Sequence, residues 1–453
     1  MIPATPKPAT SAITRLRKMI PLIGFITALA LVVFNAQAES LSGKASFELP
    51  ALTVVKQEQI NGREVRSYEH ADMPQWGYQT PQKDEFHLVL PAKPMKAAPL
   101  CVVLHSAGGN GREALPAICQ PHDRNFYGDE TYYVLCLDCA KNKNDWWWGQ
   151  EENARNPDRY RNELCPTEQR AFATIEWVIR TFGIDRNRVY LNGISMGGSG
   201  SLGLGLARGE VFAAVSVVVP AGVKHMEFRT LNRKFPDPPP LFNISSQADT
   251  YALGQENLLK FCEDNRYFLA FAWGPFGHTA DVSLANLAVY EYPWLSIRKN
   301  EAYPAFTHAT TDNRYPGYLN TTVPDQNGQI NGYFRWQNIE DASRNFEMEL
   351  RLVTKDELSR PVETPREAIA DITPRRLQRF AIGQGTAYQW QVTRAEKVLQ
   401  SGKVTADASG VLTIPSVTIS DTPSRLKIAP DKATGGSVAP AAADKPRSVN
   451  KTN

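Results

Sequence analysis

The chain has 453 residues, of which 42% are hydrophobic, and a formal net charge of +3 at pH 7. This length suits two or three domains with a sizeable buried core. The small positive charge argues against a polyanionic partner, so we expect no nucleic-acid binding.

The first 38 residues have the three parts of a secretory signal peptide. Residues 15–18, RLRK, supply positive charge, residues 19–34 form an apolar stretch, and AQA precedes Glu39 as a cleavage site. Sixteen apolar residues are fewer than a membrane-spanning helix usually needs. We therefore favour cleavage after Ala38 over an uncleaved anchor. This predicts a secreted or periplasmic protein with no stable membrane span.

Six cysteines are compatible with an oxidising compartment but do not by themselves establish disulfides. Cys101 and Cys136 lie inside apolar runs, which predicts buried thiols. Cys139 and Cys165 lie in polar segments on either side of a long loop and are the candidate disulfide pair. Cys136 and Cys139 also form a C-x-x-C motif, but it follows a strand end rather than starting a helix. A redox role is therefore disfavoured.

Residues 39–84 form an N-terminal extension that includes the predicted strand GREVRSYEHA. From residue 85 to residue 300, apolar runs of strand length alternate with helical patterns. The predicted strands are DEFHLVLPA, PLCVVLH, TYYVLCLD, RVYLNGIS, VFAAVSVVV, PPLFNIS and YFLAFAW, and the predicted helices include PTEQRAFATIEWVIRTFG and TYALGQENLLKFCEDN. Such alternation indicates an α/β domain with a mostly parallel sheet and crossover helices.

The pattern changes after a linker at residues 301–315. Residues 316–430 contain short alternating segments broken by Gly, Asp and Pro, with no long helical pattern, which predicts a small β-sandwich. Residues 431–453 are rich in Ala, Ser, Lys and Pro, so we expect them to be disordered.

The stretch VYLNGISMGGSGSLGLGL, residues 189–206, surrounds Ser195 with glycines. Residues 193–197 spell G-x-S-x-G, the nucleophile elbow that presents a serine on a sharp turn from strand to helix. There the Met196 N–H is expected to point at a developing oxyanion.

Two other interpretations of this glycine-rich stretch are possible. Residues 198–203 spell G-x-G-x-x-G, but no acidic residue follows about 20 positions later, as a dinucleotide site requires. The glycines could also serve only close packing of a helix on a sheet.

A serine needs a base to accept its proton and an acid to orient that base. Asp249 follows the predicted strand PPLFNIS, and His278 lies in a Gly- and Pro-rich loop after YFLAFAW. The chain order Ser195, Asp249, His278 is that of α/β-hydrolases. Taken singly, Asp249 could be a helix N-cap and His278 a surface histidine.

A second oxyanion donor is expected from the loop after an earlier strand. The segment VVLHSAGGNG follows a buried strand, and Ser106 stands where hydrolases usually carry glycine. We assign the second donor to the Ala107 N–H, with the Gly108 N–H as the alternative.

Residues 85–298 resemble the α/β-hydrolase superfamily, and especially its secreted esterases, which include feruloyl and acetylxylan esterases and polyhydroxyalkanoate depolymerases. The motifs LHSAGGNG, GISMGG, SSQADT and GPFGH carry the resemblance, in the family's order. Prolyl-oligopeptidase-like enzymes share the same catalytic core. The resemblance implies an α/β-hydrolase fold and hydrolysis of an ester or amide without a cofactor. It does not cover the predicted sandwich.

Three consecutive tryptophans, Trp146, Trp147 and Trp148, follow a strand on the loop side of the predicted sheet. Indole rings stack on sugars and aromatic acids. These residues therefore predict a substrate such as a feruloyl or acetyl ester linked to a polysaccharide, although the loop could also pack on itself. The alternatives are a prolyl-oligopeptidase-like peptidase and a non-catalytic glycan-binding relative. No residue spacing suggests a metal site.

Overall fold

A computed structural model describes residues 49, 52–70, 73–78, 84–120, 124–140, 145–150, 163–221, 237–279, 286–318 and 326–431. The predicted signal peptide and, apart from Asp431, the predicted C-terminal tail lie outside these residues. Within the described ranges, no helix has both the length and the apolar character needed to span a lipid bilayer.

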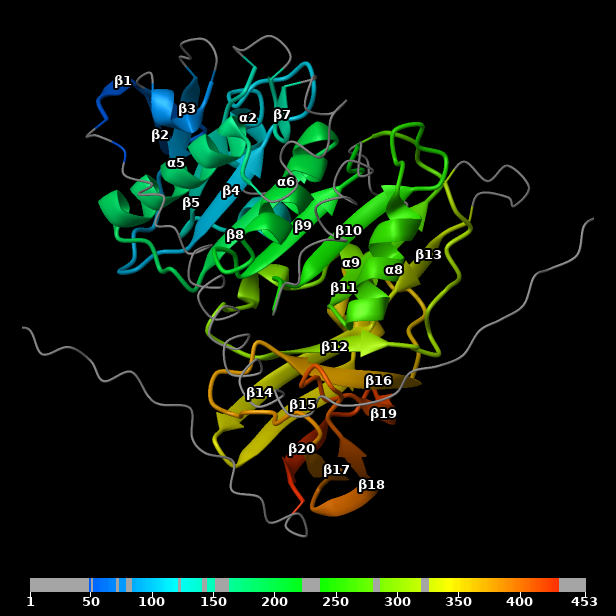
Figure 1. Ribbon diagram of the computed structural model, residues 1–453. Helices are drawn as coiled ribbons and strands as arrows, with labels where there is room; N and C mark the ends of the chain where they lie inside the picture. Colours follow the sequence, from blue (N-terminus) through cyan, green and yellow to red (C-terminus); the bar gives the residue numbers. More distant parts are fainter. Residues whose placement is uncertain are drawn as a thin grey trace, which may run out of the picture. The chain divides into compact units, whose positions relative to one another are not determined.

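The main sheet has ten strands in the order β1-β2-β3-β5-β4-β8-β9-β10-β11-β13 (Figure 1). The strands from β5 to β11 in this order run parallel, and the strands at the two edges are antiparallel. The central strands are buried along their whole length, because both faces are covered. The bounds are β1 (Val54–Ile60), β2 (Arg63–Glu69), β3 (Glu85–Val89), β4 (Leu100–Leu104), β5 (Tyr133–Leu137), β8 (Val189–Ile194), β9 (Ala214–Val218), β10 (Leu241–Ser246), β11 (Leu269–Gly274) and β13 (Gly328–Ile330).

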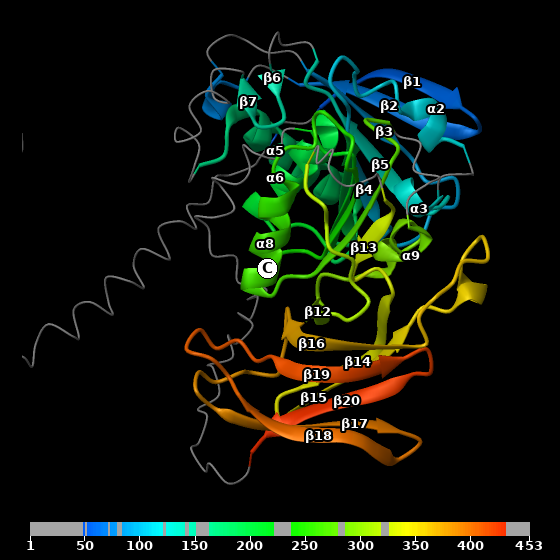
Figure 2. The same cartoon turned by 90° about the vertical axis from the view of Figure 1, so that its right-hand side faces the viewer.

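Helices cover both faces of this sheet (Figure 2). The long helices α5 (Pro166–Phe182), α6 (Met196–Ala207) and α8 (Gln255–Asn265) lie on one face. The short helices α2 (Leu115–Ile118), α3 (Arg124–Tyr127) and α9 (Leu287–Tyr290) lie on the other. α5 begins with a proline at its first position and ends at Gly183, which has a φ of 64°. The large, mostly parallel sheet with helices on both faces agrees with the α/β architecture predicted from the sequence.

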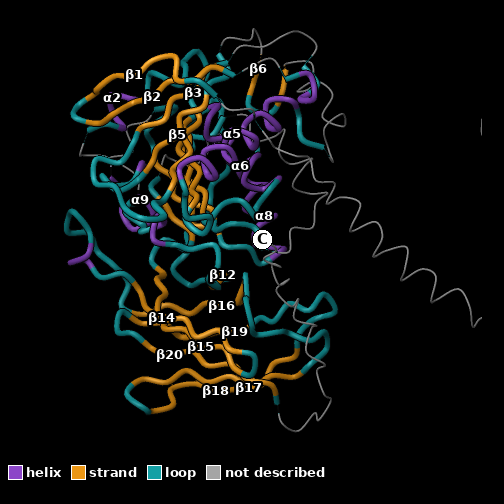
Figure 3. The backbone as a smooth tube through the Cα atoms, turned by 90° about the vertical axis from the view of Figure 1, so that its left-hand side faces the viewer, coloured by secondary structure: helices purple, strands orange, loops and turns teal. Residues whose placement is uncertain are grey.

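The C-terminal β region, which we define as residues 334–430, forms two antiparallel sheets together with β12 (Figure 3). Buried side chains from both sheets belong to one core that continues into the main sheet. Side chains alternate between buried and partly exposed along β20, as expected for a sheet with one covered face. One sheet contains β12 (Tyr303–Thr307), β16 (Glu367–Arg375) and β19 (Ile414–Ser420). The other contains β14 (Phe334–Ala342), β15 (Asn345–Leu352), β17 (Ala387–Arg394), β18 (Lys397–Thr405) and β20 (Ser424–Pro430).

The predicted boundaries do not separate the sheets. β12 lies inside the segment expected to be a linker, residues 301–315, and pairs with β16. β13 lies inside the segment expected to be a sandwich but pairs with β11 of the main sheet. The chain therefore crosses between the two parts three times, into β12, back into β13 and out again into β14. The Arg376 guanidinium joins the two parts by donating to the Ala213 carbonyl at 3.1 Å.

Candidate active site

Ser195 occupies the turn between β8 and α6. Its backbone has φ 57° and ψ −121°, a conformation that residues with a side chain rarely adopt. The Ser195 N–H donates to the Val218 carbonyl, and the Ser195 carbonyl accepts from the Ala221 N–H, both at 3.0 Å. Neighbouring backbone therefore holds the serine in the strained turn that a nucleophile elbow requires.

The two glycines of the G-x-S-x-G motif allow α6 to approach the sheet. A Cβ atom on Gly193 would lie 2.3 Å from the backbone of Gly197, and one on Gly197 would lie 2.0 Å from the Leu104 carbonyl oxygen. Neither separation is sterically possible, so both positions need glycine. The same contacts place the end of β4 beside the first turn of α6.

The later glycines of this stretch lie inside α6 rather than in a loop. A Cβ atom on Gly200 would lie 2.4 Å from the Trp147 side chain, and one on Gly205 would lie 2.7 Å from the Val215 side chain. These glycines serve close packing of the helix. The dinucleotide interpretation of residues 198–203 is wrong, because its first glycine would have to end a strand and cradle a phosphate.

Asp249 and His278 meet Ser195 at the carboxyl ends of β8, β10 and β11. His278 Nδ1 lies 2.7 Å from Asp249 Oδ2, and His278 Nε2 lies 2.7 Å from Ser195 Oγ. Because a carboxylate only accepts, Nδ1–H donates to Asp249 and Nε2 is left to accept the serine proton. Asp249 is fully buried, whereas the His278 side chain is 26% exposed and can reach a substrate.

Two further contacts orient this group. The Asp249 Oδ1 atom accepts from the Tyr251 N–H at 2.8 Å, and the Ser246 hydroxyl accepts from the Gly277 N–H at 2.9 Å. The helix that follows Asp249 starts later than its sequence suggests, since its N-cap is Gly254 with a φ of 90°. Asp249 is therefore not a helix N-cap, and one of its oxygens remains for His278.

The loop after β4 lies against the elbow. The Ser106 hydroxyl donates to the Ile194 carbonyl at 2.9 Å, so the serine that replaces the usual glycine ties this loop to the residue before Ser195. Ala107 is exposed, and Gly108 follows with a φ of 74°. The backbone N–H groups of this loop and of Met196 thus lie on the same edge of the sheet as Ser195.

His105 fixes the start of this loop. Its Nδ1–H donates to the Ser106 carbonyl at 2.8 Å, and its Nε2 atom accepts from the Cys139 N–H at 3.1 Å. Burial lowers the pKa of His105, so the ring is neutral, as these two bonds require. The His105 carbonyl in turn accepts from the Trp147 indole N–H at 3.0 Å.

The three consecutive tryptophans, Trp146, Trp147 and Trp148, differ in their burial and contacts. Trp147 is only 1% exposed and packs between His105 and Gly200, so its predicted contact with substrate is wrong. Trp146 ends β6 (Asp145–Trp146), and Trp148 lies in the turn before β7 (Gly149–Gln150). Trp146 and Trp148 are partly exposed and stack with ring centroids 5.4 Å apart.

The predicted disulfide between Cys139 and Cys165 is not formed, and all six cysteines are buried. Each member of the pair has a separate place in the core. The Cys139 sulfur lies 3.5 Å from His105 Nε2. Cys165 is the N-cap of α5, where its N–H donates to the Glu168 carboxylate at 2.8 Å.

Tyr251 is a site residue that the sequence did not reveal. Its ring centroid lies 4.8 Å from that of His278, and the residue is 57% exposed. Nothing in the local pattern distinguishes this tyrosine from a core residue, because its exposure depends on where the loop after β10 folds. An exposed aromatic ring beside His278 is a candidate surface for a substrate group.

The described residues contain no group of three or more His, Cys, Asp or Glu side chains arranged to hold a metal ion. We therefore assign no metal ligands to this site.

No model of a known protein family matches the chain, and no curated protein matches it. Among solved structures, the chain is similar to an S-formylglutathione hydrolase from Agrobacterium tumefaciens, with 15% identity and a TM-score of 0.37, over 50% of this chain and 92% of that one. An S-formylglutathione hydrolase from Staphylococcus aureus matches with 14% identity and a TM-score of 0.35, over 51% and 93% of the two chains. A Bacillus cereus carboxylesterase matches with 13% identity and a TM-score of 0.35, over 47% and 92%.

Proposed function

We propose that the protein is a serine hydrolase that cleaves carboxylic esters through an acyl-enzyme. The observation that carries this proposal is the continuous line of contacts from Asp249 through His278 to Ser195, each at 2.7 Å. In this arrangement the buried carboxylate orients the half-buried imidazole, and the imidazole can accept the proton of the hydroxyl on the strained turn. This is the arrangement that activates a serine as a nucleophile.

In the first step, Ser195 Oγ attacks the ester carbonyl while His278 Nε2 takes its proton. Asp249 holds the imidazole in the required tautomer and stabilises its charged form. The N–H groups of Met196, at the first turn of α6, and Ala107 hold the oxyanion. His278 then protonates the leaving alcohol, and in the second step it activates water to release the acid and free Ser195.

We propose an ester linked to a polysaccharide, with a feruloyl or acetyl acyl group, as the substrate. Support comes from the partly exposed rings of Trp146 and Trp148, after β5, and the exposed ring of Tyr251, after β10. Trp147 anchors the β6-β7 pair against α6 and the loop after β4, the two elements that flank Ser195. The signal-like pattern of residues 1–38 supports action outside the cytoplasm.

The test compares hydrolysis of p-nitrophenyl acetate, p-nitrophenyl butyrate and methyl ferulate by the protein and by Ser195→Ala. Ser201→Ala is a matched control, since this fully buried hydroxyl on α6 has no hydrogen-bond partner in the described chain. Turnover that is lost only in Ser195→Ala supports the proposal, and the ratio of rates distinguishes small from aromatic acyl groups. A folded protein that cleaves none of the three esters would contradict it.

A further inference from the structure

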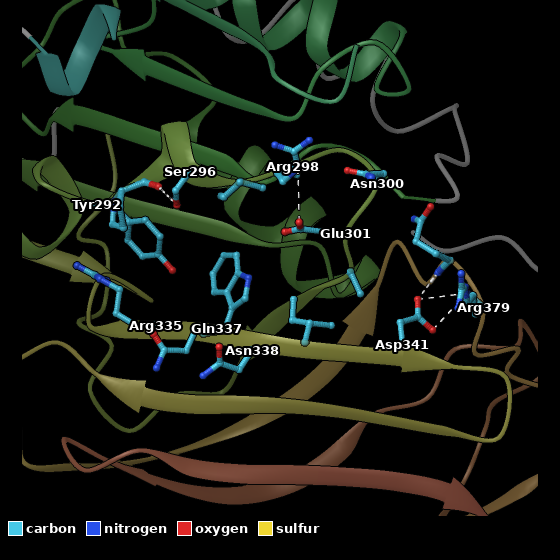
Figure 4. Close-up of a pocket in the computed structure, with 16 residues that line it drawn as sticks. Tyr292, Ser296, Arg298, Asn300, Glu301, Arg335, Gln337, Asn338, Asp341 and Arg379 are labelled. Carbon is cyan, nitrogen blue, oxygen red and sulfur yellow. Dashed lines mark hydrogen bonds and ion pairs between the residues drawn. The ribbon is translucent and has the colours of Figure 1, made fainter. Parts of the chain in front are cut away.

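The chain after α9 contacts the main sheet at both ends of its parallel strands. Near the start of β8, residues from 292–302 and from β14 line a cavity of about 490 Å³ (Figure 4), and the Ile297 carbonyl accepts from the Tyr190 hydroxyl at 2.9 Å. Ser195 follows the opposite end of β8. At that opposite end of the sheet, residues 315–318 lie against the loop after β10. This second contact therefore reaches a loop of the proposed active site.

Tyr318 makes two hydrogen bonds, one to this loop and one to the helix that follows it. Its hydroxyl donates to the Thr250 carbonyl at 2.6 Å, and its N–H donates to the Glu256 carboxylate at 2.5 Å. Thr250 directly follows Asp249, and Glu256 lies in the first turn of α8. The two bonds therefore hold residues 250–256 at both ends, although Thr250 itself is exposed.

The bond to Thr250 acts on the same peptide unit that holds Asp249. The Thr250 C=O and the Tyr251 N–H belong to one planar amide, and in a trans peptide they point in opposite directions. The C=O accepts from Tyr318, and the N–H donates to Asp249 Oδ1 at 2.8 Å. Because the amide is rigid, a bond that fixes its oxygen also fixes its N–H. The amide thus links the Tyr318 hydroxyl to the carboxylate whose Oδ2 atom bonds to His278.

Residues 315–318 are themselves held in place. Gly317 has a φ of 96°, a conformation that favours glycine and that turns the chain just before the tyrosine. The Tyr315 ring packs edge-on against the Trp273 ring of β11, with centroids 5.2 Å apart. Since β11 leads into the His278 loop, this short segment contacts the elements that carry both the acid and the base of the proposed triad.

We propose that Tyr318 is a positioning residue for Asp249: its hydroxyl orients the amide after Thr250, and this amide orients the carboxylate towards His278. The proposal rests on the hydrolase function, because the orientation of Asp249 affects turnover only if His278 is the base. Asp249 stabilises the imidazolium that forms in the transition state. Loss of the Tyr318 hydroxyl should therefore lower kcat rather than raise KM.

Tyr318→Phe keeps the ring and removes only the hydroxyl. We expect kcat for p-nitrophenyl butyrate to fall about threefold to tenfold, the effect of one hydrogen bond. KM and the melting temperature should change little, because water can reach the exposed Thr250 carbonyl. Tyr132→Phe is the matched control: this half-buried tyrosine precedes β5, and its hydroxyl donates to the Leu295 carbonyl at 3.1 Å. That variant should keep the full kcat.

A second background separates positioning from a general change in the loop. In Asp249→Asn the carboxylate that the amide orients is gone, so Tyr318→Phe should change the remaining kcat by less than about twofold. If Tyr318 supports only the shape of the loop, its loss should lower kcat by the same factor in both backgrounds.

The downfield proton NMR signal of His278 Nδ1–H reports the bond to Asp249 without any turnover. Its loss in His278→Gln assigns it. We expect Tyr318→Phe to move this signal upfield, because the bond weakens, and Tyr132→Phe to leave it in place. If the unmodified protein cleaves no ester, the hydrolase function fails, and the signal still decides whether Tyr318 orients Asp249. The positioning role is overturned if the signal does not move, if kcat of an active protein does not fall, or if it falls equally in both backgrounds.

Discussion

The carbonyl oxygen of Leu104 lies 2.0 Å from the point that a Cβ atom on Gly197 would occupy. This contact joins the end of β4 to the first turn of α6. It therefore fixes the loop that carries Ala107 against the turn that carries Ser195. The distance between the two proposed oxyanion donors depends on how closely these elements pack.

Replacement of Gly197 by alanine should push α6 away from β4. We expect the free energy of unfolding to fall by about 1–3 kcal/mol, as in other overpacked sites, and the turnover of p-nitrophenyl butyrate to fall as well. Gly203→Ala on the same helix is the control, because a Cβ there would lie 4.0 Å from its nearest neighbour, the Glu168 carboxylate. That change should stabilise the helix by about 0.5–1 kcal/mol. Equal effects of the two substitutions in urea unfolding would contradict the packing argument.

Asp249→Asn should leave the fold in place but remove the charge that orients His278. We expect turnover of p-nitrophenyl butyrate to fall by about 10⁴, because the imidazole loses its required tautomer. Circular dichroism checks the fold. Asp264→Asn, at an exposed ion pair with Lys260, should retain full activity. A loss of less than tenfold for Asp249→Asn would exclude a role for this carboxylate in the reaction.

Tyr251 should influence which acyl group is accepted. Because its ring is exposed beside His278, Tyr251→Ala should raise KM for methyl ferulate by about tenfold, the effect of losing one good aromatic contact. KM for p-nitrophenyl acetate should change little, and so should the melting temperature. Leu253→Ala removes another exposed side chain from the same turn and serves as the control. If both substrates or both variants respond alike, Tyr251 does not contact the acyl group.

His70 should make stability depend on pH. Its Nδ1–H donates to the Asp84 carbonyl, and its Nε2 atom lies 2.7 Å from the Thr174 hydroxyl. Burial, reinforced by Arg170, lowers the pKa of His70 to about 3. Between this value and the ordinary pKa of about 6.5, the unfolded chain binds the extra proton. The free energy of unfolding should therefore fall with falling pH in this range, by up to about 1.4 kcal/mol per pH unit.

Urea unfolding at intervals from pH 7 to pH 4 measures this slope. His70→Gln cannot take up the proton, so the slope should become shallower whatever the absolute stability of the variant. His308→Gln changes a histidine whose side chain is 67% exposed and should retain most of the slope. An unchanged slope in His70→Gln would show that other groups control the acid sensitivity.

The features that could be predicted from the sequence are those that depend on the pattern of neighbouring residues. Apolar runs of strand length predict the buried strands of the main sheet, and the glycines around Ser195 predict its turn. Asp249 and His278 could be placed because each follows such a run in a fixed chain order. The structure brings Ser195, Asp249 and His278 together, although their spacing along the chain does not indicate how close they lie in space.

The features that could not be predicted depend on contacts between distant segments. Trp147 is buried because Gly200 leaves space for it on α6, which no pattern at residues 146–148 indicates. β12 and β13 each pair with a strand that lies far away in the chain. Their own residues do not show which sheet they join, so the boundary at residue 316 could not be placed. The position of the Cys139 sulfur beside His105 likewise depends on a contact between distant segments.

The central claim is that Ser195 is activated by His278, and covalent trapping with diethyl p-nitrophenyl phosphate tests it most directly. Attack by Ser195 Oγ would form the phosphate ester and expel p-nitrophenolate, while His278 takes the serine proton. We predict one p-nitrophenolate released per chain, one diethylphosphoryl group on the peptide that contains Ser195, and the same result for Ser201→Ala. Release that persists in Ser195→Ala, or none from the folded protein, would contradict the account.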